Sequence, residues 1–160
     1  MKVKRTPLPE YIRSLPGTEL PNGYVISEDD NKKDGPTWHR EGASAYVLKA
    51  TGPLGSPKAI KILRREKVED KLARSRFLGE VKKLQSVRHP NIVSVEDSGL
   101  LPVTDSGRHY KLPYYVMEFV DGAQIDKWAS QKEAAHEYLE VGAVCSLIRQ
   151  VVTALAHVHS

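Results

Sequence analysis

The sequence has little cysteine and no long apolar run, and each shortage excludes a class of protein. Its single cysteine, Cys145, excludes an internal disulfide and favours a reducing compartment. No run of about 18 apolar residues occurs, so no transmembrane helix is expected. Pro7 and Pro9 stand where a signal peptide needs its apolar stretch. We therefore expect a cytoplasmic chain without a membrane partner, in which Cys145 is a small core residue rather than a nucleophile.

The excess of positive charge is also small. The net charge is +4 over 160 residues, with 28% charged and 40% hydrophobic residues, which is an ordinary composition for a folded protein. The basic stretch "KILRREKVEDKLARSR" is interrupted by Glu66, Glu69 and Asp70. Mixed charges of this kind indicate a solvated helix face. We therefore expect no nucleic-acid partner, and a chain long enough for one domain or two small lobes.

Turn residues divide the chain into short strands. Residues 1–23 carry four prolines and little periodicity, which predicts an extended arm or linker. The charged stretch "EDDNKKDGP" predicts a loop. Strands are expected at "GYVIS", at "AYVLKA" and "KAIKIL" joined by "TGPLGSP", and at "IVSVEDSGL" and "LPYYVMEFV" separated by "TDSGRH".

Three segments have helical periodicity. A stripe from Ala73 to Val87 predicts a helix over 66–87, which ends at "RHPN" because Pro90 disfavours helix at the residue before it. A short helix is expected over 125–131. A broad apolar face predicts a third helix over 139–158; its residues are Val144, Leu147, Ile148, Val151, Val152 and Leu155. The fold class expected is therefore α+β.

Two charged residues occupy partly apolar faces. In "KAIKIL", Lys61 shares a strand face with Ala59 and Leu63. Glu80 lies within the apolar stripe of the first long helix. A lysine on the wet face of a strand and a glutamate at the rim of a helix are the ordinary explanations for such residues. A charge on a buried face is costly unless it is paired, so each could instead need a partner.

These motifs resemble the N-terminal part of a protein kinase of the serine/threonine type. "KAIKIL" is similar to the strand with the kinase lysine, and "RFLGEVKKLQSVRHPNIV" to the helix whose glutamate, here Glu80, lies 19 residues further along. "YYVMEFVDG" resembles the last strand and hinge of the N-lobe, and "SLIRQVVTALAHVHS" the long helix of the C-lobe. The resemblance covers about residues 39–160.

The resemblance implies a role for each matching residue. Lys61 would hold the α- and β-phosphates of ATP, Glu80 would hold Lys61 in position, and the backbone at Gly42 and Ser44 would approach the phosphates. Val47 and Ala59 would supply apolar surface beside the adenine ring. Met117 would be the gatekeeper at the back of the pocket. The backbone of Glu118 and Val120 would hydrogen-bond the adenine edge, and Gln124 would lie near the ribose.

The sequence departs from the family in two places. The glycine-rich loop G-x-G-x-x-G retains only Gly42, with Arg40 and Ala45 in place of the other glycines, so weaker or altered ATP binding is expected. The sequence stops at Ser160, before the catalytic loop and the magnesium-binding motif of the family. The 160 residues alone are therefore expected to be inactive, with Mg²⁺ bound only in the complete kinase and no metal site here. His157 and His159 make no such site, because two histidines without a further ligand are only a helix end.

The resemblance implies a domain organisation and a function. It divides the chain into an arm over 1–23, a kinase-like N-lobe over 24–120, and the hinge exit with the truncated C-lobe helices over 121–160. The parent protein would transfer the γ-phosphoryl of ATP to a serine or threonine of a protein substrate. The alternative is a finished, non-catalytic interaction module of pseudokinase type. In either case the apolar face of helix 139–158 would favour association.

Overall fold

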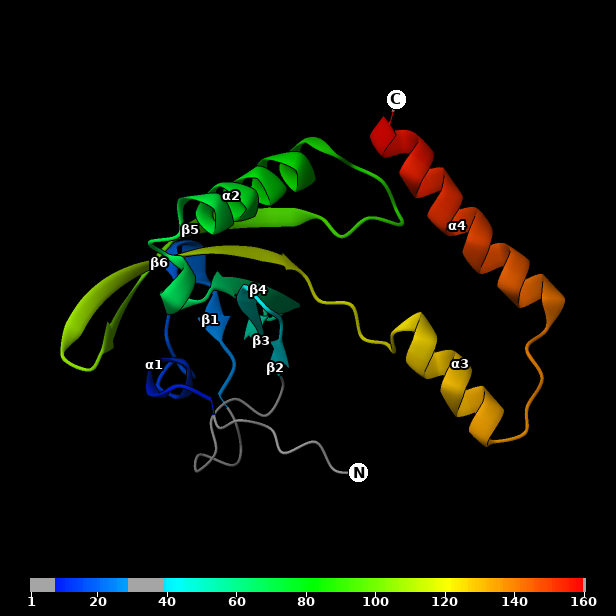
Figure 1. Ribbon diagram of the computed structural model, residues 1–160, viewed down its shortest axis with the longest axis horizontal. Coiled ribbons are helices and arrows are strands. Elements are labelled where there is room, and N and C mark those ends of the chain that lie inside the picture. The colour runs from blue at the N-terminus through cyan, green and yellow to red at the C-terminus, as the bar shows by residue number, and fades with distance from the viewer. Residues whose placement is uncertain (1–7, 29–38, 160) are drawn as a thin grey trace.

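One twisted antiparallel sheet forms the centre of the molecule (Figure 1). The computed structural model describes residues 8–28 and 39–159. A long helix, α2 (Lys71–Ser86), lies on one face of the sheet, and a short helix, α1 (Glu10–Arg13), lies on the other. Two more helices, α3 (Ile125–Ala134) and α4 (Val141–His159), follow the sheet and lie to one side of it.

The strands pair in the order β1-β3-β4-β6-β5, and β2 pairs with β3 on the same side as β1. Their bounds are β1 (Val25–Ile26), β2 (His39–Glu41), β3 (Ala45–Thr51), β4 (Pro57–Leu63), β5 (Val95–Asp105) and β6 (Arg108–Glu118). The two strands predicted at "AYVLKA" and "KAIKIL" are thus β3 and β4. The loop predicted at "EDDNKKDGP", apart from Glu28, and residues 1–7 of the predicted arm lie outside the described residues.

Strand β4 separates two apolar cores. Ile60 and Ile62 are fully buried on the face that α1 covers, whereas Leu63 packs with Phe77 and Val81 of α2 on the other face. This division follows from the alternation of side chains along a strand. Lys61 is therefore on the α2 face, as its spacing from Leu63 predicts.

The hairpin of β5 and β6 is longer than the sequence predicts. The turn expected over 104–109 contains only Ser106 and Gly107, because Asp105 already pairs with Arg108. Both turn residues have positive φ, 50° and 74°, as two-residue hairpin turns of this kind require. Eleven residues in each strand consequently form a ribbon that extends past the rest of the sheet.

Helix α2 begins at Lys71, later than the predicted start at Glu66. The Asp70 carboxylate accepts hydrogen bonds from the backbone N–H groups of Leu72 and Ala73, both at 3.0 Å, and these bonds define the N-cap. They lower the pKa of Asp70, the bond from Ala73 most strongly. Residues 65–67 form a separate 3₁₀ turn instead of the first helical turn. At the other end the helix stops at Ser86, with Val87 as its C-cap, within one residue of the predicted end.

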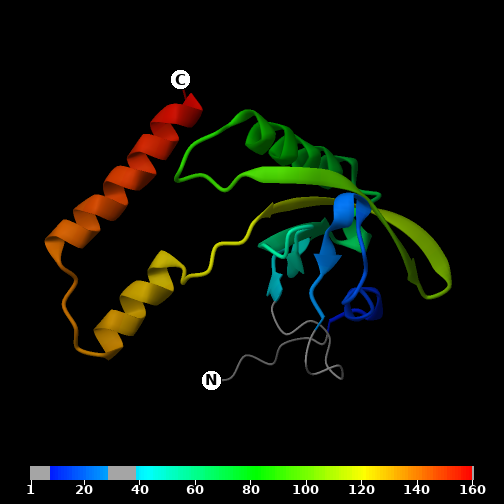
Figure 2. The ribbon, with the colours of Figure 1, turned by 180° about the vertical axis from the view of Figure 1, so that it is seen from behind.

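The N-terminal segment is not the extended arm that its prolines predict. From Leu8 onward it packs on the sheet, and Tyr11, Ile12 and Leu15 are buried in one cluster with Leu101 and other residues of the long hairpin. Figure 2 shows this segment beneath the sheet, on the face opposite α2. Residues 8–23 are therefore part of the folded lobe, because their apolar side chains have an apolar surface to cover.

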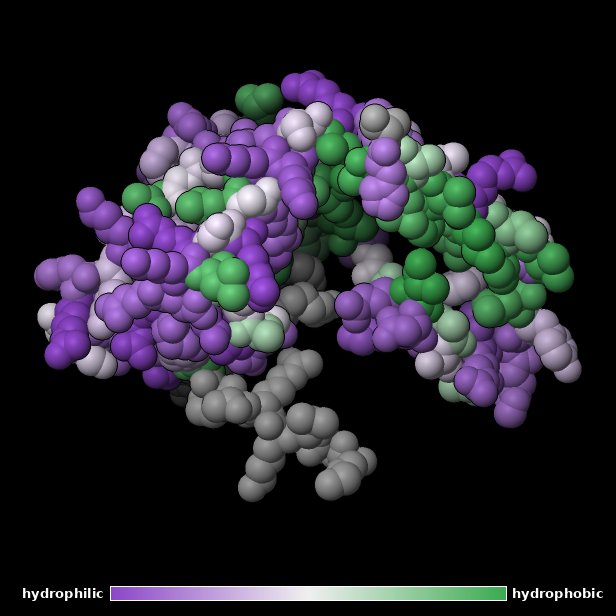
Figure 3. All heavy atoms as spheres, turned by 45° about the horizontal axis from the view of Figure 1, so that its top comes forward, coloured by the Kyte–Doolittle hydropathy of each residue, from purple (hydrophilic) through white to green (hydrophobic). Residues whose placement is uncertain are grey.

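Helix α4 has a wide exposed apolar face. Figure 3 shows apolar side chains gathered along it; Ile148, Val151, Val152 and Leu155 are each about half exposed. Cys145 is also exposed, contrary to the core position expected for it.

Among the described residues, α4 is long and apolar enough to cross a membrane by length and composition alone, which the sequence did not lead us to expect. A core helix of a soluble protein has the same length and composition, so these properties alone do not make α4 a membrane span.

Two contacts connect α4 to the loop that follows α2. The Asn91 side-chain amide donates a hydrogen bond to the Gln150 side chain at 2.9 Å. The rings of His89 and His157 lie 5.3 Å apart, centroid to centroid. The segment "RHPN" is therefore both the exit from α2 and a contact surface for the C-terminal helix.

Candidate functional site

The centre of the candidate site is an ion pair between strand β4 and helix α2. Lys61 Nζ lies 2.7 Å from Glu80 Oε1. The Tyr115 hydroxyl of β6 donates a hydrogen bond to the same oxygen at 3.0 Å. The Lys61 side chain is only 22% exposed, so the ion pair is partly shielded from water. The structure thus brings together the two charged residues that the sequence places on apolar faces.

Tyr115 is a member of this cluster that the sequence reasoning missed. It pairs directly with Lys61 across the sheet, and the lysine nitrogen lies 5.5 Å from the centre of its ring. Burial raises the pKa of the Tyr115 hydroxyl, and the charge of Glu80 raises it further. The hydroxyl therefore keeps its proton and remains a donor at neutral pH. The alternation in "YYVM" was the available signal, because it places Tyr115 and Met117 on one face.

Apolar residues surround the ion pair on the same face of the sheet. Val47 pairs with Lys61, and Ala59 pairs with Met117. Ala59 is buried, whereas Val47 and Met117 are partly exposed. Side chains at these positions lie beside one another, so this face presents an apolar surface next to a cation.

The loop between β2 and β3 contains Gly42, Ala43 and Ser44, all exposed. The Gly42 N–H donates to the Ala45 carbonyl at 2.9 Å and closes a tight turn. A hollow beside this loop is lined by residues of the loop and of α2, among them Ala43, Ser44, Phe77 and Glu80. The loop and Glu80, one partner of the ion pair, therefore border the same space.

The remaining candidate residues lie at and beyond the end of β6. The Glu118 N–H donates to the Ser94 carbonyl at 3.2 Å. Val120 is 61% exposed on the extended segment that leads to α3. Gln124 is the N-cap of α3, and its side chain makes no capping hydrogen bond. These three residues do not line the hollow beside Ser44. They form a second set of candidate residues, at and beyond the end of β6.

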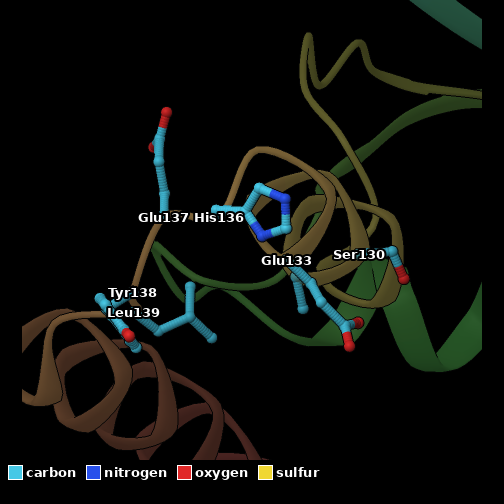
Figure 4. A pocket seen from close by; sticks show the side chains of 7 residues that line it. Ser130, Glu133, His136, Glu137, Tyr138 and Leu139 are labelled. Atoms are coloured by element: carbon cyan, nitrogen blue, oxygen red, sulfur yellow. The ribbon is translucent and has the colours of Figure 1, made fainter.

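A second hollow lies between α3 and the segment that leads to α4 (Figure 4). It is lined by Ala129, Ser130, Glu133, His136, Glu137, Tyr138 and Leu139. Within 8–28 and 39–159, no group of three or more His, Cys, Asp or Glu side chains could hold a metal ion. This hollow contains neither the ion pair nor the loop, so the candidate site is the one around Lys61.

Removal of the Tyr115 hydroxyl is expected to destabilise the fold. A hydrogen bond to a carboxylate contributes about 1.5–3 kcal/mol, so Tyr115→Phe should lower the free energy of unfolding by an amount near the lower end of that range. Urea unfolding followed by circular dichroism measures the change. Tyr138→Phe is the matched control, because Tyr138 is 98% exposed. Equal stability of the two variants would contradict the role of the Tyr115 hydroxyl.

A comparison with protein families finds a match over most of the chain. The model of the family described as "Protein kinase domain" matches residues 41–160. Among curated proteins, the chain is 32% identical over 121 residues to "Serine/threonine-protein kinase Pkn1" of Myxococcus xanthus, a match that covers 76% of this chain and 15% of that protein. It is 40% identical over 70 residues to "Probable serine/threonine-protein kinase PknB" of Bifidobacterium longum, covering 43% of this chain and 10% of that protein.

Solved structures show the same fold. The kinase domain of PknI from Mycobacterium tuberculosis superposes with a TM-score of 0.62 at 22% identity, covering 89% of this chain and 49% of that one. This likeness confirms the α+β fold class, with an N-lobe followed by the start of a C-lobe. The chain spans about half of that domain and a small part of the curated relatives.

Proposed function

The chain belongs to the protein kinase family, and we propose that it is the nucleotide-binding lobe of a protein serine/threonine kinase. The parent protein would transfer the γ-phosphoryl of ATP to a serine or threonine hydroxyl of a protein substrate. The observation that carries this proposal is the 2.7 Å ion pair between Lys61 and Glu80, beside the loop that contains Gly42. In the family a lysine in this position holds the α- and β-phosphates, and the glutamate holds the lysine.

The apolar face around Lys61 fits an adenine ring. Val47 and Ala59 on adjacent strands would cover the ring, and Met117 would limit its depth. The Glu118 N–H already donates to the Ser94 carbonyl. The Glu118 carbonyl would therefore accept a hydrogen bond from the adenine amino group. The Val120 N–H would serve as the complementary donor.

The polar residues fit the rest of the nucleotide. Lys61 would neutralise phosphate charge, and the backbone N–H groups around Gly42 and Ser44 would donate to phosphate oxygens. The exposed amide of Gln124 would bond a ribose hydroxyl. ATP supplies the phosphoryl group. Mg²⁺ would be held by residues of the complete kinase, since no cluster of carboxylates stands among the described residues.

A second candidate function is a non-catalytic interaction module. It is favoured by Arg40 and Ala45 in place of two loop glycines, and by the exposed apolar face of α4. Such a module would bind a protein partner through α4, with or without a nucleotide. We also propose a cytoplasmic location, where ATP and protein substrates are available.

Calorimetric titration of the 160-residue chain with ATP and with adenosine tests the proposed nucleotide site. We expect both ligands to bind, and ATP to bind more tightly because only ATP reaches Lys61 and the loop. The expected gain is about 1.5–3 kcal/mol, the range for hydrogen bonds to charged groups. Absence of ATP binding at millimolar concentration would contradict the proposal and favour the interaction module.

A further inference from the structure

Arg64, the residue directly after β4, contacts the loop between β2 and β3 at several points. Its Nε donates to the Gly42 carbonyl at 2.9 Å, and its backbone N–H donates to the Ser44 carbonyl at 3.0 Å. Its Nη2 lies 2.6 Å from Glu41 Oε1, in an ion pair. One residue therefore holds a carboxylate and two carbonyls within a single turn.

The arginine is itself held in place. Its Nη1 donates to the Tyr46 hydroxyl at 3.0 Å, and its guanidinium carbon lies 4.3 Å from the centre of the Tyr46 ring. The Arg64 side chain is only 16% exposed. Tyr46 is almost completely buried between the strands and the N-terminal segment. An arginine fork with this many fixed partners is more rigid than an exposed ion pair.

These contacts determine which way the loop amides point. In a trans peptide the C=O and the following N–H point in opposite directions, and no described peptide bond is cis. Because the Gly42 and Ser44 carbonyls point toward Arg64, the N–H groups of Ala43 and Ala45 point away from it. Ala43 and Ala45 are two residues apart, and two N–H groups directed away from the same anchor can donate to one phosphate group.

We propose that Arg64 is a positioning residue for the phosphate-binding loop, and that it replaces the conformational role of the two glycines that this loop lacks. The proposal deepens the proposed function and rests on it, since it concerns how the same loop meets phosphate. Glycine permits a tight loop through backbone freedom. In this chain the loop shape is imposed instead by side-chain and backbone bonds from Arg64.

The test compares ATP and adenosine binding to the 160-residue chain and its variants. Arg64→Lys keeps the charge but cannot bond Glu41, Gly42 and Tyr46 together, because a lysine has no planar fork. We expect this variant to lose ATP affinity roughly tenfold, with adenosine affinity unchanged within about twofold. Arg65→Lys is the control, because Arg65 faces Asp105 and Tyr110 rather than the loop; it should change neither affinity.

Two results would overturn the proposal: unchanged ATP affinity in Arg64→Lys, or an equal loss for ATP and adenosine. Amide hydrogen exchange separates this failure from failure of the nucleotide site. Arg64→Lys should speed exchange of the Gly42 N–H, which donates to Ala45, about tenfold without speeding exchange in β4 and β6. If the unmodified chain binds no ATP, the nucleotide proposal fails. Unchanged exchange at Gly42 would then overturn the role of Arg64 as well.

Discussion

The variant Lys61→Met is expected to lose phosphoryl transfer by at least about 100-fold, in a form of the protein that extends through the catalytic loop. Methionine has a similar length but no charge, so it cannot neutralise phosphate or pair with Glu80. The measurement is ATP-dependent transfer to a protein substrate or to the kinase itself, at saturating ATP. The loss should also appear in the 160-residue chain as weaker ATP binding.

The matched control for this prediction is Lys58→Met. Lys58 is on the same strand but on the opposite face, where its Nζ lies 2.5 Å from Glu96 Oε1. Both variants remove one lysine and one ion pair from β4, so their effects on stability should be comparable. Transfer by Lys61→Met within a few-fold of the unmodified protein would contradict the assignment of Lys61.

The variant Ile12→Ala is expected to lower the free energy of unfolding by about 2–5 kcal/mol, the usual range for a buried isoleucine truncated to alanine. Ile12 has no exposed surface and packs in the cluster that joins α1 to the long hairpin. Urea unfolding of the 160-residue chain measures the loss. A typical domain has a free energy of unfolding of about 5–15 kcal/mol, so this loss should be readily measurable at 25 °C.

Arg13→Ala is the control for this second prediction, because Arg13 is on the same short helix but exposed. The free energy of unfolding of this variant should be close to that of the unmodified chain. If Ile12→Ala also unfolds like the unmodified chain, residues 8–23 do not belong to the folded lobe, and the extended arm predicted from the prolines would be the better description.

The sheet face with the charged pair was readable from the sequence because strand alternation is local. Lys61 is two residues from both Ala59 and Leu63, so its face follows from spacing alone. The helical stripe likewise placed Glu80 toward the sheet. The 2.7 Å contact between them depends on how α2 packs on the sheet. The resemblance to kinases implied this contact, and the structure contains it.

The N-terminal segment and the long hairpin were harder to read. Leu8, Ile12 and Leu15 have helical spacing, but the prolines around them dominate the local signal. Burial of these residues depends on Leu101 and Val103, about 90 positions away, in a part of the hairpin that neither predicted strand includes. The burial of the N-terminal segment could not be predicted without the full length of the hairpin, and the hairpin's apolar surface could not be explained without the segment that covers it.

Arg64 was missed for a related reason. An arginine after a strand and before a charged helix is typical of a solvated surface, and its neighbours Arg65, Glu66 and Lys67 strengthen that interpretation. Its partners Glu41 and Gly42 are more than 20 positions away. Only pairing of β3 with β4 brings the loop next to it.

The central claim is that ATP binds on the α2 face of the sheet, between the loop at Gly42 and the end of β6. Backbone amide chemical shifts of the isotope-labelled chain, recorded during titration with ATP, test this most directly. The account predicts shifts at Ala43, Ser44 and Val120, and none in α1. Shifts confined to the hollow around His136 and Tyr138, or no shifts at all, would contradict it.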